Sequence, residues 1–317
     1  MKRFKNILLV AENGPGAKAT TARTVALAKR NRAQLTIVDV VEQIPKQIGR
    51  FVTDVSAPEL VALIIRKRQE QLEKLIAPAR RQRIKAAADV LVGRPFVEII
   101  RAVVRNGHDL VVMSSDCGGR LRGSAFGSMS LKLMRKCPCP VWVMTPTRRK
   151  RYARIVAAVG LDGCDNAASS LDRTILELAT ALTRTEEGEL HIVHAWSLWG
   201  ERMLRGGFVS MPAEMVAEAV RDARSAARTQ LDVLLAEYAL EGLKHEVHLL
   251  KGDAGEVIPA FAERKRVDLI VMGTLCRTGI PGFIIGNTAE NILRKVDCSV
   301  LTVKPEGFVS PVSPEKE

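Results

Sequence analysis

Two copies of one stretch of sequence decide the fold. Residues 108–146 read HDLVVMSSDCGGRLRGSAFGSMSLKLMRKCPCPVWVMTP, and residues 267–305 read VDLIVMGTLCRTGIPGFIIGNTAENILRKVDCSVLTVKP. They align without gaps at a constant offset of 159, which pairs Asp109 with Asp268 and Gly127 with Gly286. A register held over so long a stretch indicates an internal duplication.

The duplication extends to the openings, because KNILLVAE at residue 5 matches ARIVAAVG at residue 153. Short Val- and Ile-rich runs alternate with longer helical patterns in each copy, which predicts parallel strands joined by crossover helices. The predicted strands are 6–11, 35–40, 87–92, 109–114 and 140–145, then 153–159, 190–195, 245–250, 268–273 and 298–303. The predicted helices are 17–31, 57–80, 95–106 and 126–136, then 166–183, 212–239, 255–265 and 287–296. We therefore predict an α/β protein with two tandem doubly wound five-strand parallel-sheet domains of the nucleotide-binding, Rossmann-like type.

Length and composition agree with two domains. The chain has 317 residues, 47% of them hydrophobic and 26% charged, which excludes a disordered or fibrous protein. We expect domains at 1–147 and 152–305, joined by the basic run Arg148 to Arg151, and a mobile tail at 306–317. The glycine-containing segment 197–211 is expected to be a loop, either partly ordered on the surface or able to close over a site.

We expect no signal peptide from the first residues, and no stretch approaches the length of a membrane span. Six cysteines in such a chain are expected to be reduced thiols, so we expect a cytoplasmic protein. Residues 1–150 carry 29 Lys and Arg against 11 Asp and Glu, a net +18, whereas residues 151–317 carry 19 against 24, a net −5. The basic first copy is either a solvated, soluble surface or a surface for non-specific contact with a polyanion such as RNA or DNA.

The loop after the fourth strand of the second copy is the candidate ligand site. It begins at Gly273 and ends at Gly286, where Asn287 and Thr288 open a helix. Ligands of open parallel sheets bind at the carboxyl ends of the strands, and free N–H groups at a helix start favour phosphate. Asn287 or Thr288 could instead serve only as the cap of that helix.

This loop resembles the nucleotide-binding loop of the universal stress protein family, whose spacing is G-x2-G-x9-G-[ST]. The duplicated arrangement is similar to the tandem, UspE-type members of that family. The segments GRPFVEII, GHDL and LRKCPCPVW in the first copy add to the resemblance. The resemblance implies a five-strand parallel sheet in each domain, pairing of the two domains through their last strands within one chain, and binding of ATP or AMP.

Carried over residue by residue, the resemblance implies a nucleotide site in the second copy. Met272 and Gly273 would lie beside the ribose, Ala195 would line the adenine pocket, and Gly286, Asn287 and Thr288 would contact the phosphates. This sequence departs from the family at three of these positions: Cys276 replaces the second glycine, Asn287 replaces Ser or Thr, and Gly160 replaces the adenine-contacting aspartate, with Asp162 two residues later.

The first copy departs further from the family pattern. Ser114 and Cys117 replace both leading glycines, Glu12 stands at the aspartate position, and only Gly127 and Ser128 are kept. Val40 and Met113 are the counterparts of Ala195 and Met272. Added side chains would crowd a phosphate chain, so we expect a degenerate site there and a structural or partner-binding role for this domain.

The remaining signals are weaker. His191/His194 and His245/His248 suggest a metal, but a separation of three sends strand side chains to opposite faces, so no metal site is predicted. Cys139 and Cys298 are expected to be small buried hydrophobes, and Cys117 and Cys276 to fill space or sense redox state. No catalytic constellation is visible, so we expect no enzyme activity beyond slow ATP hydrolysis.

These patterns predict a cytoplasmic stress-response protein that binds an adenine nucleotide in its second copy and acts as a sensor or regulator. Two alternatives stay open: a degenerate pocket for an apolar or lipid-like metabolite, lined by Phe283, Ile284 and Ile285, and an RNA- or DNA-interacting protein with a vestigial pocket. Association into a homo-oligomer is compatible with each of them.

Overall fold

A computed structural model gives the structure of the chain. It describes residues 4–11, 14, 16–42, 57–115, 126–146, 151–161, 166–206, 211–274 and 286–313. The chain divides into two compact units, the first built mainly from residues 1–147 and the second mainly from residues 148–307.

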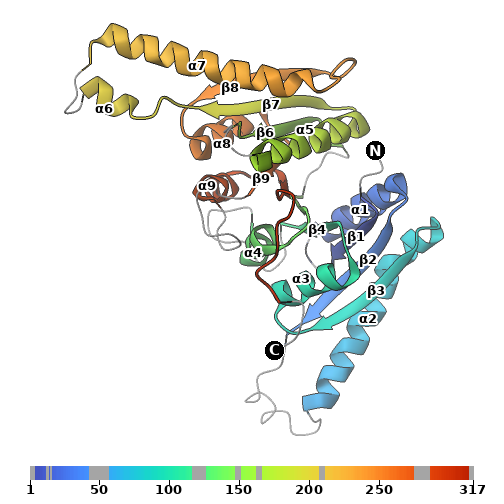
Figure 1. Ribbon diagram of the computed structural model, residues 1–317. Helices are drawn as coiled ribbons and strands as arrows, with labels where there is room; N and C mark the ends of the chain where they lie inside the picture. The colour runs from blue at the N-terminus through green and yellow to red at the C-terminus, as the bar shows by residue number, and fades with distance from the viewer. Residues whose placement is uncertain are drawn as a thin grey trace. The chain divides into compact units, whose positions relative to one another are not determined.

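The first unit is a five-strand parallel sheet with strand order β3-β2-β1-β4-β5. Its elements in chain order are β1 (Asn6–Val10), α1 (Ala17–Asn31), β2 (Gln34–Val41), α2 (Ala57–Arg81), β3 (Ala86–Val92), α3 (Pro95–Asn106), β4 (Leu110–Ser114), α4 (Ser128–Lys136) and β5 (Val141–Met144) (Figure 1). This topology is doubly wound, because the chain moves outward from β1 to β3 and then returns to continue on the other side of β1.

The second unit repeats this topology with strand order β10-β9-β6-β7-β8. Its elements are β6 (Arg154–Val159), α5 (Asn166–Glu186), β7 (Glu189–Trp196), α6 (Glu201–Gly206), α7 (Ala213–Ala236), β8 (His245–Lys251), α8 (Ala254–Lys265), β9 (Leu269–Gly273), α9 (Asn287–Lys295) and β10 (Ser299–Val303). The predicted fold class is confirmed, and each predicted strand and helix is present.

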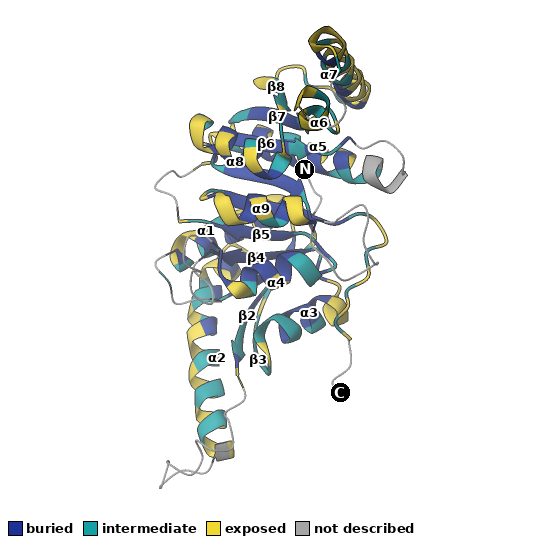
Figure 2. Ribbon diagram, turned by 90° about the vertical axis from the view of Figure 1, so that its left-hand side faces the viewer, coloured by how far each residue is buried: buried dark blue, intermediate teal, exposed yellow. Residues whose placement is uncertain are grey.

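The hydrophobic cores lie on both faces of each sheet. All five residues of β4 and of β10 are buried, as expected when helices cover a parallel sheet from both sides. The buried residues follow the strands and the helix faces that touch them, whereas α2 and α7 expose their outer faces (Figure 2). Aliphatic side chains, with few aromatic ones, supply these cores.

The paired aspartates of the two repeats have the same structural role. Asp109, just before β4, accepts hydrogen bonds from the backbone N–H groups of Lys5 and Asn6 at the start of β1. Asp268, just before β9, accepts at 2.8 and 2.9 Å from the N–H groups of Ala153 and Arg154 at the start of β6. Each aspartate therefore ties the first strand of its sheet to the fourth at the amino-terminal edge.

Two equivalent glycines turn the chain between the third strand and the helix that follows. Gly93 and Gly252 have φ of +146° and +135°, a region that other residues rarely adopt. A Cβ atom at Gly93 would also lie 2.8 Å from Cγ of Glu98, and one at Gly252 would lie 2.7 Å from Cγ1 of Val257. Both repeats therefore need glycine here for conformation and for space.

The structure also describes two segments that lie outside the repeated strand and helix pattern, residues 201–206 and 308–313. Residues 201–206, within a segment expected to be a loop, form the short helix α6, so that expectation is wrong for these six residues. At the other end of the chain, residues 308–313 group with the first unit, where Nε of Arg101 donates a 3.1 Å hydrogen bond to the carbonyl oxygen of Ser313. No helix of the described residues is long and apolar enough to cross a membrane.

Candidate functional site

Strand register brings the candidate residues of the second unit to one level at the carboxyl edge of the sheet. Ala158 pairs with Met272, Val159 with His194, and Val303 with Gly273. The residues that follow these pairs are Gly160, Ala195, Thr274 and Lys304, one from each of four neighbouring strands. The edge includes the gap between β6 and β9, where the strand order reverses and where parallel sheets bind ligands.

Helix α9 opens this edge with its first turn. Gly286 is the N-cap residue, and among the described residues no side chain makes a cap hydrogen bond there, whereas Asp253 at the N-cap of α8 accepts from the N–H of Gly255. Asn287 and Thr288 lie in the first turn with exposed side chains. The alternative in which one of them is the cap residue is therefore wrong, and the part of the chain that the structure describes supplies no side-chain acceptor at this cap.

The end of β9 is joined both to α9 and to β10. The N–H of Gly286 donates to the carbonyl oxygen of Thr274 at 3.2 Å, which brings the two ends of the intervening loop together. The ammonium group of Lys304 donates to the Thr274 hydroxyl, and both side chains are buried. A cationic group therefore lies beside Thr274, the residue whose carbonyl oxygen binds the N-cap residue of α9. Sequence reasoning missed this feature because Lys304 lies outside the glycine motif.

A buried carboxylate fixes the turn after β6. Asp172 of α5 accepts hydrogen bonds from the N–H groups of Gly160 at 2.8 Å and Leu161 at 2.9 Å. Burial raises the pKa of Asp172, while the two N–H donors and the nearby His194 oppose that change. The resemblance implies an aspartate at the position of Gly160, and the structure has a carboxylate next to this position that is supplied from α5.

The other predicted residues of the second unit have mixed surroundings. Met272 is buried in the sheet, and Ala195 is half-buried. Gly273 has a packing reason to lack a side chain, because a Cβ atom there would lie 2.7 Å from Cδ2 of Leu171. Asp162 and Cys276 lie outside the described residues, as does the loop with Phe283 to Ile285.

The equivalent edge of the first unit holds more side-chain atoms. Ser114 is fully buried at the end of β4, where Gly273 stands in the second unit. Gly127 is the N-cap of α4 without a side-chain cap bond, its carbonyl oxygen accepts from the hydroxyl of Ser130 at 2.8 Å, and Ser128 is exposed. Met113 is buried and Val40 half-buried, and Glu12 and Cys117 lie outside the described residues.

The described cysteines lie near the starts of the last strands. Sγ of Cys137 lies 3.6 Å from Sγ of Cys139, whose pKa is raised by the neighbouring thiol and by burial. Burial also raises the pKa of Cys298 to about 12. Thiols that stay protonated are poor nucleophiles. Cys139 is buried, as expected of a small hydrophobic residue, whereas Cys298 is only half-buried, so that expectation is wrong for Cys298.

Two tandem doubly wound units, each with a glycine-led helix after its fourth strand, define a tandem α/β protein with a Rossmann-like fold. Residues 3–145 and residues 151–304 each match the universal stress protein family. The chain belongs to this family and is a tandem member of it.

Curated relatives support the tandem assignment over the whole chain. Universal stress protein E of Escherichia coli strain K12 is 30% identical over 229 residues, which are 71% of this chain and 69% of the relative. Universal stress protein E of Photorhabdus laumondii is 24% identical over 330 aligned residues, which cover all of both chains.

Solved structures share the fold. A functionally unknown protein of Pseudomonas aeruginosa PAO1 has a TM-score of 0.72 at 20% identity, covering 97% of this chain and 95% of its own. A universal stress protein of Archaeoglobus fulgidus has a TM-score of 0.64 at 21% identity, covering 94% and 98%.

Proposed function

We propose that this protein is a cytoplasmic stress-response sensor or regulator that binds ATP or AMP at the carboxyl edge of its second unit. The observation that carries the proposal is the start of α9 beside Thr274. No side chain of the described residues caps its first-turn N–H groups, and the ammonium group of Lys304 lies at the same edge. Oriented N–H groups and a nearby cation are the elements that bind phosphate oxygens in proteins.

Each part of the nucleotide has a candidate contact. The phosphates would meet Gly286, Asn287 and Thr288, with Lys304 as an added positive charge. The adenine and ribose would lie toward Ala195 and the turn at Gly160. Asp172 would act through that turn, because its carboxylate holds the N–H groups of Gly160 and Leu161.

The first unit is proposed to be the degenerate copy. The buried Ser114 side chain occupies the position at which the second unit has Gly273. A role in structure or partner contact is therefore proposed for this unit. We propose no catalytic role for either unit beyond slow ATP hydrolysis.

Ligand-dependent stabilisation of the full chain tests the proposal. ATP and AMP should each raise the melting temperature of the wild type, because a ligand that binds only the folded state adds about 2.7 kcal/mol at a hundredfold excess over its Kd. Gly286→Val should abolish this shift, and Gly127→Val, the matched change in the first unit, should keep it. Equal loss in both variants would overturn the assignment to the second unit.

A second pair of variants tests the cation. Lys304→Met should reduce the shift caused by ATP more than the shift caused by adenosine, because only ATP has phosphates. Lys244→Met, which removes an exposed lysine of the same unit, is the control. Native mass spectrometry of freshly purified protein distinguishes a nucleotide from an apolar or lipid-like metabolite by mass, and a co-purified metabolite of the second kind would overturn the nucleotide proposal.

A further inference from the structure

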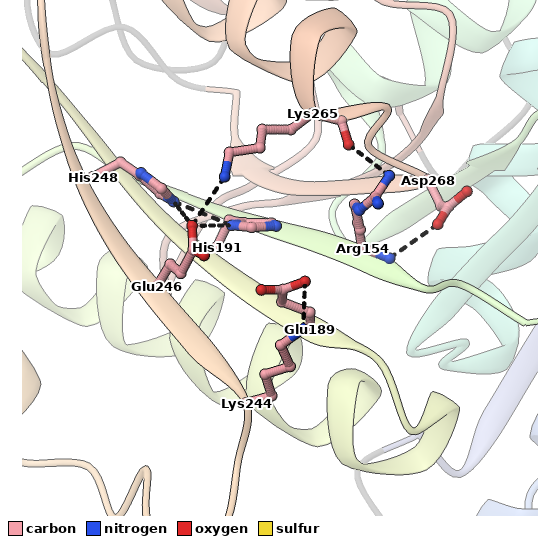
Figure 3. A network of polar contacts seen from close by, with 8 residues as sticks. All are labelled: Arg154, Glu189, His191, Lys244, Glu246, His248, Lys265 and Asp268. Atoms are coloured by element: carbon pink, nitrogen blue, oxygen red, sulfur yellow. Dashed lines mark hydrogen bonds and ion pairs between the residues drawn. The ribbon is translucent and has the colours of Figure 1, made fainter.

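A cluster of two histidines and a glutamate lies on β7 and β8, apart from the carboxyl edge. In the parallel register His191 pairs with Glu246, and His248 is two residues further along β8 on the same face. His191 is 1% exposed, and the side chain of His248 is 18% exposed. Figure 3 shows the three side chains directed toward one another from the two neighbouring strands.

The three facing atoms form a nearly regular triangle. Nδ1 of His191 lies 3.1 Å from Nε2 of His248 and 3.7 Å from Oε2 of Glu246, and Nε2 of His248 lies 3.4 Å from that oxygen. Ligand atoms bound to a tetrahedral zinc ion at about 2.05 Å are about 3.3 Å apart. Ligands at adjacent positions of an octahedral ion with the same bond lengths would be about 2.9 Å apart. The observed sides suit tetrahedral coordination better.

The chemistry of the donors also suits zinc. Burial lowers the pKa of both His191 and His248, so both imidazoles are neutral near pH 7 and can offer a lone pair. Nε2 of His191 is buried without a hydrogen-bond partner among the described residues, which leaves Nδ1 as the ring atom with polar contacts. Phe261 of α8 packs at 4.6 Å from the His248 ring and 5.8 Å from the His191 ring, measured between centroids, and fixes both imidazoles.

We propose that His191, Glu246 and His248 form a zinc site with three protein ligands and a fourth position open to water or an added ligand. Two imidazoles and one carboxylate are an established ligand set for such open zinc sites. The partly exposed Glu246 gives a solvent path to the cluster. The proposal is independent of nucleotide binding, because His191 and Glu246 lie near the starts of β7 and β8, whereas Gly160, Ala195 and Thr274 lie at the carboxyl ends of their strands.

One neighbouring cation competes with the metal. Nζ of Lys265 lies 3.0 Å from Oε2 of Glu246, the oxygen that faces the histidines. Zinc binding must displace this ammonium group from that oxygen, so removal of the Lys265 charge should strengthen zinc binding. The other charged groups that act on the histidines are Glu189, Arg154 and Arg264.

Sequence reasoning missed this site because it compared histidines within one strand. His191 and His194 do have separate partners, and Nδ1 of His194 lies 3.1 Å from the carbonyl oxygen of Val159. The relevant pair lies across two strands, and a strand register cannot be deduced from spacing within either strand. The expectation of no metal site rested on that incomplete comparison.

Zinc titration of the full-length protein tests the proposal. Protein stripped with EDTA is titrated with Zn²⁺ in competition with a chromophoric chelator, and one equivalent is expected to bind per chain. His248→Ala and Glu246→Gln should each weaken binding at least about tenfold, as loss of supporting groups alone does in known sites. His245→Ala is the matched control, because His245 lies on the same strand but faces the other side, and it should bind as the wild type does.

Three further readouts separate a metal site from a hydrogen-bonded cluster. Lys265→Met should bind zinc more tightly than the wild type, a gain that a purely structural role would not produce. Co²⁺ should give the visible spectrum of a tetrahedral nitrogen- and oxygen-ligated ion without thiolate bands, which excludes the cysteines. Binding should weaken as the pH falls and the imidazoles take up protons.

The outcomes are decisive in both directions. Equal zinc affinity in the wild type, His248→Ala and Glu246→Gln would overturn the proposal, as would thiolate bands or the absence of binding. Circular dichroism of each variant verifies folding. Because Glu246 is partly exposed, Glu246→Gln keeps the test valid if His248→Ala does not fold.

Discussion

Replacement of Asp172 by alanine should strongly destabilise the second unit. The Asp172 side chain accepts from two backbone N–H groups, those of Gly160 and Leu161, and the residue is only 5% exposed. A buried donor left without a partner costs about 1–3 kcal/mol, so two would cost about 2–6 kcal/mol. Gly160 is half-buried, so a hydrogen bond to water would replace part of the bond that its N–H group loses. We therefore expect a loss of about 2–4 kcal/mol in the free energy of unfolding.

Urea denaturation followed by tryptophan fluorescence measures this loss in the unit concerned. A Trp142→Phe background removes the tryptophan of the first unit and leaves Trp196 and Trp199 as reporters of the second. Asp172→Asn keeps the shape and one acceptor oxygen, so it should cost about half as much as alanine. Asp222→Ala, on the exposed face of α7, should change the unfolding free energy by less than about 0.5 kcal/mol.

The result that would refute this reasoning is a loss of less than about 0.5 kcal/mol for Asp172→Ala. That result would mean that water replaces the carboxylate at both N–H groups without cost. A large loss with unchanged ATP binding would retain the structural role of Asp172 and remove its proposed indirect role at the nucleotide site.

Three further predictions concern packing, pH and charge. Gly188→Ala should cost about 1–3 kcal/mol of unfolding free energy by denaturation, because a Cβ atom there would lie 2.7 Å from the backbone oxygen of Tyr152, whereas Gly206→Ala has open space. The melting temperature of metal-free protein should fall as the pH is lowered below 6.5. Burial lowers the pKa of His108, His191, His194 and His248 in the folded state, so the unfolded chain takes up protons at a higher pH than the folded one. A His194→Gln variant should show a shallower fall in melting temperature with pH. In a filter-binding assay at low salt, the full chain should bind RNA or DNA. The slope of log affinity against log salt concentration should fall by about one for each phosphate-contacting residue removed, as in Arg81→Ala or Arg83→Ala. If the chain binds no nucleic acid at low salt, the basic charge of the first copy remains a solubility feature.

The sequence predicted the fold well because the repeat and the apolar runs are local signals. Strand β4, predicted at 109–114, spans Leu110–Ser114, and helix α3 at 95–106 matches its predicted bounds. The prediction specified doubly wound parallel sheets but not the order of their strands, which the structure supplies. Helix α6 was missed because a single short helix between glycines has little periodicity to detect.

The site was harder to predict because its polar groups come from distant parts of the chain. Asp172 lies within a helix pattern, and its contact with Gly160 depends on how α5 packs on the sheet. Lys304 follows the last strand and meets Thr274 only through the parallel register of β9 and β10. Residue type and local spacing contain no information about such long-range contacts.

The path of residues 308–313 affects the order in which the two units can finish folding during synthesis. Residues 308–313 belong with the first unit, where Arg101 binds the carbonyl oxygen of Ser313, although the whole second unit is synthesised between them. A ribosome makes about 5–20 residues per second and releases domains from the amino terminus onward, so the first unit emerges early but lacks residues 308–313 until the second unit has been made. A stop codon directly after residue 307 would therefore leave the second unit intact and impair the first.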